Sequence, residues 1–295
     1  MAKKSSTIGC QITDRDVELL IAIDRHPMTT GQLFQLSQTF AQPFSDDRLL
    51  RRRLAILRTV GLLQNWPLAT VSKGGLPHYW KLTREGYKTL YGQDVALPKR
   101  RYFEQVSTGH HHHTRCQGEF LTHLFATAVR NGVAVHQFAR ENSVRIECDA
   151  GIVYPDCAFQ LIRDGRRYNF CVEIDNGTER VRSAQDTESI QRKLVTYEAH
   201  QRQFEARDPR RYVVLLITTR SELRIGHMLE VATDVMGDSK RTVFLGCSLD
   251  AFTKSDPFCD GVLRDHLSVS RPLIRPSKSA AKRQFDRRDD SVALR

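Results

Sequence analysis

The chain has 295 residues, which is enough for about two domains of ordinary size. No run of about 18 apolar residues is present, and Met1 to Ser5 lack an apolar signal core, so the sequence predicts neither a membrane span nor secretion. The seven cysteines form no Cys-x-x-Cys pair, which favours reduced thiols and a cytoplasmic protein.

The net charge of +11 is unevenly distributed along the chain. Residues 1–105 carry 16 Lys/Arg against 9 Asp/Glu, and residues 268–295 carry 8 against 3. The intervening residues 106–267 are nearly neutral, with 21 against 22. This distribution indicates that the two ends hold a polyanion and that the central part is where any chemistry on it would take place.

Residues 13–96, which follow a basic leader over residues 1–12, predict a small domain of three helices and a β-hairpin. A capping box at Thr13 opens the first helix. Ser45 caps the third helix, which runs to about Val60. This order of elements resembles a winged helix-turn-helix, a domain that binds DNA.

The third helix carries a basic face opposite its apolar stripe. At about 100° per residue, Arg48 and Arg52 lie opposite the stripe, and Arg51 and Arg58 lie on its flanks. Together with Lys73 in the hairpin connection, these arginines are the residues that we expect to contact double-stranded DNA. Arginines also serve simply to solvate a helix surface, and that alternative stays open.

Residues 97–109 predict an interdomain linker, and residues 110–265 predict a second domain. We expect the histidine run 110–113 to lie in a solvated loop or against phosphate, because consecutive residues cannot all face one metal ion. Cys116 to Asn131 then predict an amphipathic helix with Glu119 on one flank. Glu119 either borders a site as an outer acid or is an exposed residue without function.

The strongest local signal is Asp164-Gly165 between two alternating runs, which predicts a tight β-hairpin. With a two-residue loop, Asp156 faces Glu173 across the strands, and Asp175 shares their face because side chains alternate. Like charges directly opposite each other destabilise a sheet unless a cation lies between them. The acids therefore predict a bound Mg²⁺ or Mn²⁺ ion.

The elements around this hairpin complete the predicted second domain. Ser143–Cys148 predicts a strand that joins the hairpin in a three-strand meander. The segment from about Ala184 to Arg207 predicts a helix on which Lys193 either swings toward the carboxylates or snorkels at the surface. Tyr212–Thr218 predicts a strand buried on both faces, and residues 266–295 predict a disordered basic tail.

The order helix, three strands, helix and buried strand resembles the αβββαβ core of the PD-(D/E)xK nuclease-like superfamily, with Pro155-Asp156 as its first motif and Glu173 as the second acid. The chain is also similar to the replication-relaxation family of plasmids and other mobile elements, through a winged helix, a His-rich helix, Pro-Asp, Glu173-Ile174-Asp175-Asn176-Gly177-Thr178 and Lys193-Leu194-Val195-Thr196-Tyr197. The superfamily places its lysine two residues after the acid, where this chain has Asp175. The resemblance thus implies that Lys193 substitutes from the following helix.

We therefore expect an α/β protein, α+β overall, with a winged helix-turn-helix followed by a nuclease-like domain, acting in plasmid or mobile-element replication or relaxation. The resemblance implies an Mg²⁺-dependent DNA endonuclease in which Asp156, Glu173 and Asp175 hold the metal while Lys193 and Glu119 assist hydrolysis. One alternative is a non-catalytic accessory factor for a relaxase or replication initiator. Another is a winged-helix transcriptional regulator. The sequence predicts no oligomeric state.

Overall fold

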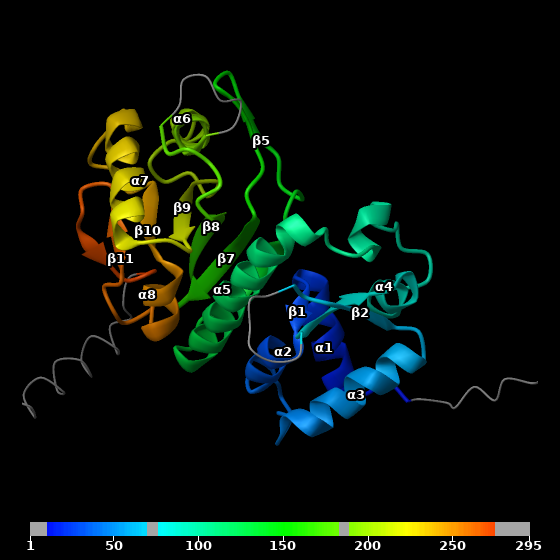
Figure 1. The fold of residues 1–295 in the computed structure, drawn as a ribbon. Helices are drawn as coiled ribbons and strands as arrows, with labels where there is room; N and C mark the ends of the chain where they lie inside the picture. The colour runs from blue at the N-terminus through cyan, green and yellow to red at the C-terminus, as the bar shows by residue number, and fades with distance from the viewer. Residues whose placement is uncertain (1–10, 70–75, 183–188, 275–295) are drawn as a thin grey trace, which may run out of the picture. The chain divides into compact units, whose positions relative to one another are not determined.

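The computed structural model describes residues 11–69, 76–182 and 189–274 (Figure 1). The described residues form helices and three β-sheets, so the predicted mixed α/β class is confirmed. The chain divides into two compact units, Met1–Thr122 and His123–Arg295, and the division falls within helix α5 (His111–Arg130). No helix in the described part of the chain is both long enough and apolar enough to cross a membrane.

The first unit contains α1 (Asp14–Arg25), β1 (Met28–Thr29), α2 (Thr30–Ser37), α3 (Asp47–Thr59), β2 (Leu63–Pro67), β3 (His78–Leu82), α4 (Arg84–Tyr91) and the 3₁₀ helices η1 (Arg100–Phe103) and η2 (Thr108–His110). Its three strands form an antiparallel sheet in the order β1-β3-β2. The capping box at Thr13 is present. Asp46 rather than Ser45 caps α3, and its side chain accepts a hydrogen bond of 2.9 Å from the Leu49 N–H, because a carboxylate favours the positive end of a helix.

The second unit contains β4 (Ala134–Ala139), β5 (Ile146–Cys148), β6 (Gly151–Val153), β7 (Cys157–Arg163), β8 (Arg166–Asp175), α6 (Ile190–Gln201), β9 (Tyr212–Thr218), α7 (Glu222–Val235), β10 (Phe244–Ser248), α8 (Leu249–Lys254), β11 (Leu263–Asp265) and β12 (Ser270–Arg271). Seven strands form one sheet in the order β12-β11-β10-β9-β8-β7-β4. The β8-β9 and β9-β10 pairs are parallel, and the other pairs are antiparallel. The C-terminal ends of β8, β9 and β10 therefore lie at one edge of the sheet.

The predicted register of the β7-β8 hairpin is confirmed. Cys157 pairs with Val172 and Arg163 with Arg166, so the loop consists of Asp164 and Gly165. Both loop residues have positive φ, 51° and 73°, as a type I′ turn requires. Local turn chemistry thus sets the pairing of two long strands.

The predicted three-strand meander is wrong in its first member. Ile146–Cys148 pairs with β6 in a separate two-stranded sheet, and β4 instead pairs with β7. Ile146 of β5 and Val153 of β6 pack into the core that contains α6, which explains why this small hairpin leaves the main sheet. The predicted disordered tail is wrong for residues 266–274, since β12 pairs with β11 and Leu273 and Ile274 are buried, while residues 275–295 lie outside the described residues.

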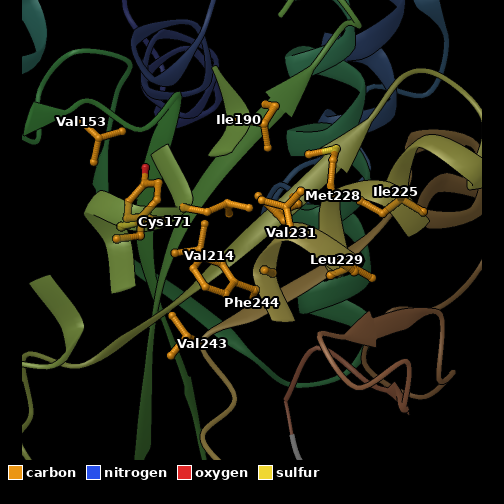
Figure 2. Packing of buried hydrophobic residues seen from close by; sticks show 14 of the residues in the cluster. Val153, Cys171, Ile190, Val214, Ile225, Met228, Leu229, Val231, Val243 and Phe244 are labelled. Carbon is orange, nitrogen blue, oxygen red and sulfur yellow. The ribbon is translucent and has the colours of Figure 1, made fainter. Parts of the chain in front are cut away.

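A buried apolar cluster joins α6 and α7 to one face of the large sheet (Figure 2). Cys171, Val214 and Leu216 contribute from the strands, while Leu194 comes from α6 and Met228 from α7. On the other face of β8, Phe170 and Val172 are also buried. Strand β8 is therefore covered on both sides, and the polar groups at its C-terminal end must find partners within the protein.

Candidate functional site

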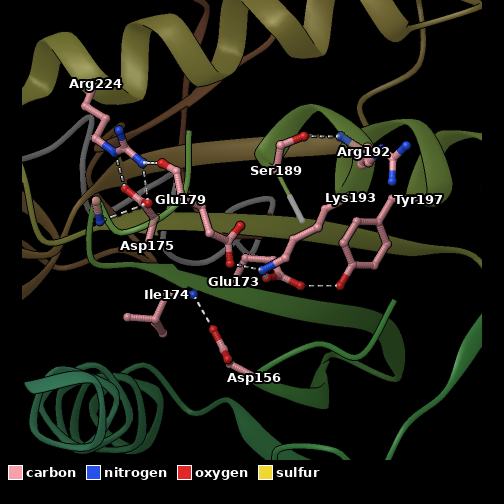
Figure 3. A network of polar contacts seen from close by, with 11 residues as sticks. Asp156, Glu173, Ile174, Asp175, Glu179, Ser189, Arg192, Lys193, Tyr197 and Arg224 are labelled. Atoms are coloured by element: carbon pink, nitrogen blue, oxygen red, sulfur yellow. Dashed lines mark hydrogen bonds and ion pairs between the residues drawn. The ribbon is translucent and has the colours of Figure 1, made fainter. Parts of the chain in front are cut away.

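Three carboxylates lie around the C-terminal end of β8. Glu173 and Asp175 point to the α6 and α7 side of the sheet, and both are buried. Asp156 immediately precedes β7, whose pairing with β8 ends at Cys157 and Val172, and its N–H donates to the Val172 carbonyl at 2.9 Å (Figure 3). The predicted hairpin register thus brings these acids to one end of the sheet.

Both oxygens of Glu173 accept hydrogen bonds from α6. Lys193 Nζ lies 3.0 Å from Oε2, and the Tyr197 hydroxyl lies 2.6 Å from Oε1. Lys193 also contacts Glu179 at 2.9 Å, so one ammonium group bridges two carboxylates. Of the two interpretations of Lys193, the structure shows the one in which its side chain reaches the acids.

The electrostatics of this group follow from burial. Burial and the nearby Asp156 charge together raise the pKa of Glu173 to about 7, against the opposing effects of Lys193 and of the hydrogen bond from Tyr197. Burial lowers the pKa of Lys193, but the charges of Glu173 and Glu179 outweigh it and hold that pKa above its ordinary value. The ammonium group therefore stays charged and supplies the positive charge that the acids need.

Asp156 and Asp175 have separate partners. Asp156 Oδ2 accepts a hydrogen bond of 2.6 Å from the Ile174 N–H. Asp175 accepts from the Thr218 hydroxyl at 2.7 Å and from two nitrogens of Arg224, at 2.6 and 2.7 Å. Burial raises the pKa of Asp175, but the hydrogen bonds from Arg224 and Thr218 outweigh it and keep that pKa low. Asp175 is thus an ionised, internally paired carboxylate.

Sequence reasoning did not assign Tyr197, Glu179 or Arg224 to the site. Tyr197 stands in the Lys-x-x-x-Tyr segment, one helical turn after Lys193, so its spacing offered a signal. Glu179 follows the acidic motif by only a few residues. Arg224 lies 49 positions after Asp175 in the chain, and no local pattern connects the two.

The donor chemistry suits a hard divalent cation, but the placement of the side chains does not. Carboxylate oxygens are the ligands that Mg²⁺ prefers. Lys193 and Tyr197 already occupy both oxygens of Glu173, and Arg224 occupies Asp175. Within residues 11–69, 76–182 and 189–274, no three His, Cys, Asp or Glu side chains are placed to hold a metal ion. The residues as arranged therefore do not fit a three-carboxylate metal centre.

Two further predictions, for Glu119 and for the histidine run 110–113, concern residues in or beside the N-terminal half of α5, which belongs to the first unit. Glu119, in α5, is about 39% exposed and lies 3.6 Å from Arg115, one turn earlier on the same helix. His111 is buried in the first turn of α5 instead of lying in a solvated loop. Its Nδ1 accepts from the Ala69 N–H at 2.9 Å, and its Nε2 donates to the Val106 carbonyl at 3.1 Å. This ring anchors the start of α5.

Helix α3 presents the predicted basic face. Arg48, Arg51, Arg52 and Arg58 are exposed, whereas the leucines of the opposite stripe are buried. Arg51 pairs with Asp47 at 2.9 Å and Arg58 donates to the Asn65 side chain at 3.0 Å. Lys73 lies outside the described residues.

A fifth arginine of α3 has a structural role. Arg53 Nε donates to Asp16 Oδ1 at 2.6 Å, and Asp16 is a buried carboxylate of α1. This ion pair ties α1 to α3. The clustering of arginines on this helix therefore combines one residue that holds the helix in place with four that face outward.

Comparison with models of known protein families gives a match. The family model described as replication-relaxation matches residues 20–213, a range that includes α3, the β7-β8 hairpin and α6. No curated protein and no solved structure matches the chain. Since the matched range covers more than half of the 295 residues, the chain belongs to the replication-relaxation family.

Proposed function

We propose that this protein binds double-stranded DNA during the replication or relaxation of a plasmid or other mobile element. The observation that carries the proposal is the exposed arginine face of α3, opposite a stripe of buried leucines. Membership of the replication-relaxation family supports the context. We assign DNA contact to Arg48, Arg51, Arg52 and Arg58.

The arrangement of the first unit supports α3 as the DNA-contacting helix. It follows α2 in the manner of the second helix of a helix-turn-helix, and the antiparallel β2-β3 pair follows as a wing would. Thirteen residues make a helix of about 20 Å, long enough to lie in a major groove. The Arg51–Asp47 pair is largely exposed, so exchanging Asp47 for a phosphate costs little.

Salt-dependent binding of a labelled duplex to the full chain tests this proposal. Replacing Arg48 and Arg52 with Gln removes two exposed cations, and we expect weaker binding and a salt slope that is shallower by about 1.8. The matched control replaces Lys99 and Arg101, two exposed cations outside α3, and should change the slope less. If both double variants changed the salt slope equally, the assignment of α3 to the DNA interface would be wrong.

For the second unit, we infer an accessory role without DNA hydrolysis, alongside a relaxase or replication initiator. Its acids are neutralised by Lys193 and Arg224 within the protein. Asp175 stands at the position where the superfamily has its lysine, and its pairing with Arg224 supports a structural role for it.

Metal-dependent hydrolysis is the second candidate, favoured by the approach of Lys193 to Glu173 beside Asp156. The order α5, β4, β7, β8, α6, β9 also follows the αβββαβ pattern. Incubation of supercoiled plasmid with the protein and Mg²⁺ or Mn²⁺ separates the two candidates. We expect no nicking. Nicking that is lost in Asp156→Ala and Glu173→Ala would establish hydrolysis instead.

A further inference from the structure

Residues 106–267, which include most of the second unit, have a charge asymmetry that their total charge conceals. Three segments, residues 164–167, 202–211 and 238–241, contain eight Lys/Arg against four Asp/Glu. The rest of the range 106–267 has thirteen against eighteen. We call the three segments the basic edge. This nearly neutral range is thus basic in three segments and acidic in the rest.

The sheet brings these three segments together. Residues 164–167 lead into β8, residues 202–211 connect α6 to β9, and residues 238–241 connect α7 to β10. Because β8, β9 and β10 are parallel neighbours, their N-terminal ends lie at the same edge of the sheet. This edge is opposite the one that holds Glu173 and Asp175.

Contacts between the segments confirm that they adjoin. The Asn169 side chain donates to the carbonyls of Pro209 and Arg211, at 2.7 and 2.9 Å, so the start of β8 is fastened to the segment before β9. A Cβ added to Gly237 would lie 3.2 Å from Arg202 Cζ, which places that guanidinium beside the turn before β10. The cations of the basic edge therefore form one surface.

Some of these cations are already paired, and others are not. Asp208 contacts Arg210 at 2.7 Å, and Glu198 lies 3.7 Å from Arg241. Arg167, Arg202 and Lys240 are exposed and make no ion pair within the residues that the structure describes. These three come from three different segments and remain available to an external anion.

We propose that the basic edge is a second DNA-binding surface, which contacts the phosphate backbone of duplex DNA independently of α3. Neighbouring strands lie about 4.8 Å apart, so the three segments span about 10 Å. Each strand of a duplex presents a phosphate every 3.4 Å or so along the axis, and a row of this length faces about two or three of them. The inference rests on the proposed function, because it assumes that the chain binds DNA.

The test compares two charge-matched triple variants of the full chain. The first is Arg167→Gln, Arg202→Gln and Lys240→Gln in the basic edge. The control is Arg145→Gln, Arg182→Gln and Lys254→Gln, which removes three exposed cations that are each paired with an exposed carboxylate elsewhere in the second unit. Duplex affinity is measured by fluorescence anisotropy over a salt series, and the thermal midpoint verifies folding.

We expect the slope of log Kobs against log salt to become shallower by about 1.8 to 2.7 in the basic-edge variant, which corresponds to two or three lost phosphate contacts, and to change little in the control. An unchanged slope in the basic-edge variant would overturn the inference, as would equal changes in both variants, which would reflect net charge alone. The Arg48→Gln/Arg52→Gln variant separates the two surfaces. If the Arg48→Gln/Arg52→Gln variant binds as tightly as wild type while the basic-edge variant binds more weakly, the proposed DNA contact by α3 is refuted and that by the basic edge is supported. If the wild-type protein binds no duplex, both proposals are refuted.

Discussion

Replacement of Lys193 by Met tests whether the carboxylate network is neutralised from within. The substitution keeps an unbranched side chain but removes the ammonium group that contacts Glu173 and Glu179 at 3.0 and 2.9 Å. Only 5% of the Glu173 side chain is exposed, so without the ammonium group this carboxyl either keeps a buried, uncompensated charge or takes up a proton, and both cost unfolding free energy. Breaking such a pair costs about 3–5 kcal/mol of unfolding free energy.

Urea unfolding of the full chain at pH 8 measures this cost. The matched control is Arg192→Met, which removes the same charge from an exposed residue of the same helix and should cost no more than about 0.5 kcal/mol. Adding Glu173→Gln to Lys193→Met should recover much of the stability, because the uncompensated charge disappears. A Lys193→Met protein as stable as wild type, or a double variant without recovery, would refute internal neutralisation.

Two further outcomes concern the scaffold of each unit. Burial raises the pKa of Asp16, but the hydrogen bonds from Arg53 and Thr13 outweigh it, so this pKa lies below the ordinary 3.8. A depressed carboxylate pKa stabilises the fold above the unfolded pKa and loses that effect as the pH falls. The stability difference between wild type and Arg53→Gln should therefore narrow below about pH 4 in thermal unfolding, and a constant difference would contradict the assignment. In the hairpin, Gly165→Ala should lower the unfolding free energy by about 1 kcal/mol, because φ is 73° there. Gly109→Ala, at a position with open space and no positive φ, is the control, and equal losses would exclude the turn geometry as the cause.

Local chemistry in the sequence determined the β7-β8 hairpin completely. Asp164-Gly165 accepts positive φ at both positions, and the alternation of side chains then fixes which residues face each other. The register from Cys157 with Val172 to Arg163 with Arg166 follows from those few residues, and it leaves Asp156 and Glu173 just beyond the last pair. The basic face of α3 was also predictable from local sequence, because a helix repeats every 3.6 residues and its spacing shows which side chains share a face.

Only the tertiary structure decided what surrounds these groups. The pairing of Asp175 with Arg224 depends on how α7 packs on the sheet. The neighbour of β7 is β4, and not the predicted strand Ser143–Cys148, because the β5-β6 hairpin is buried against α6 instead. The basic edge likewise appears only when the starts of β8, β9 and β10 are aligned by parallel pairing. Turn and helix periodicity act over a few residues, whereas the partners of a buried charge are selected by packing between segments far apart in the chain.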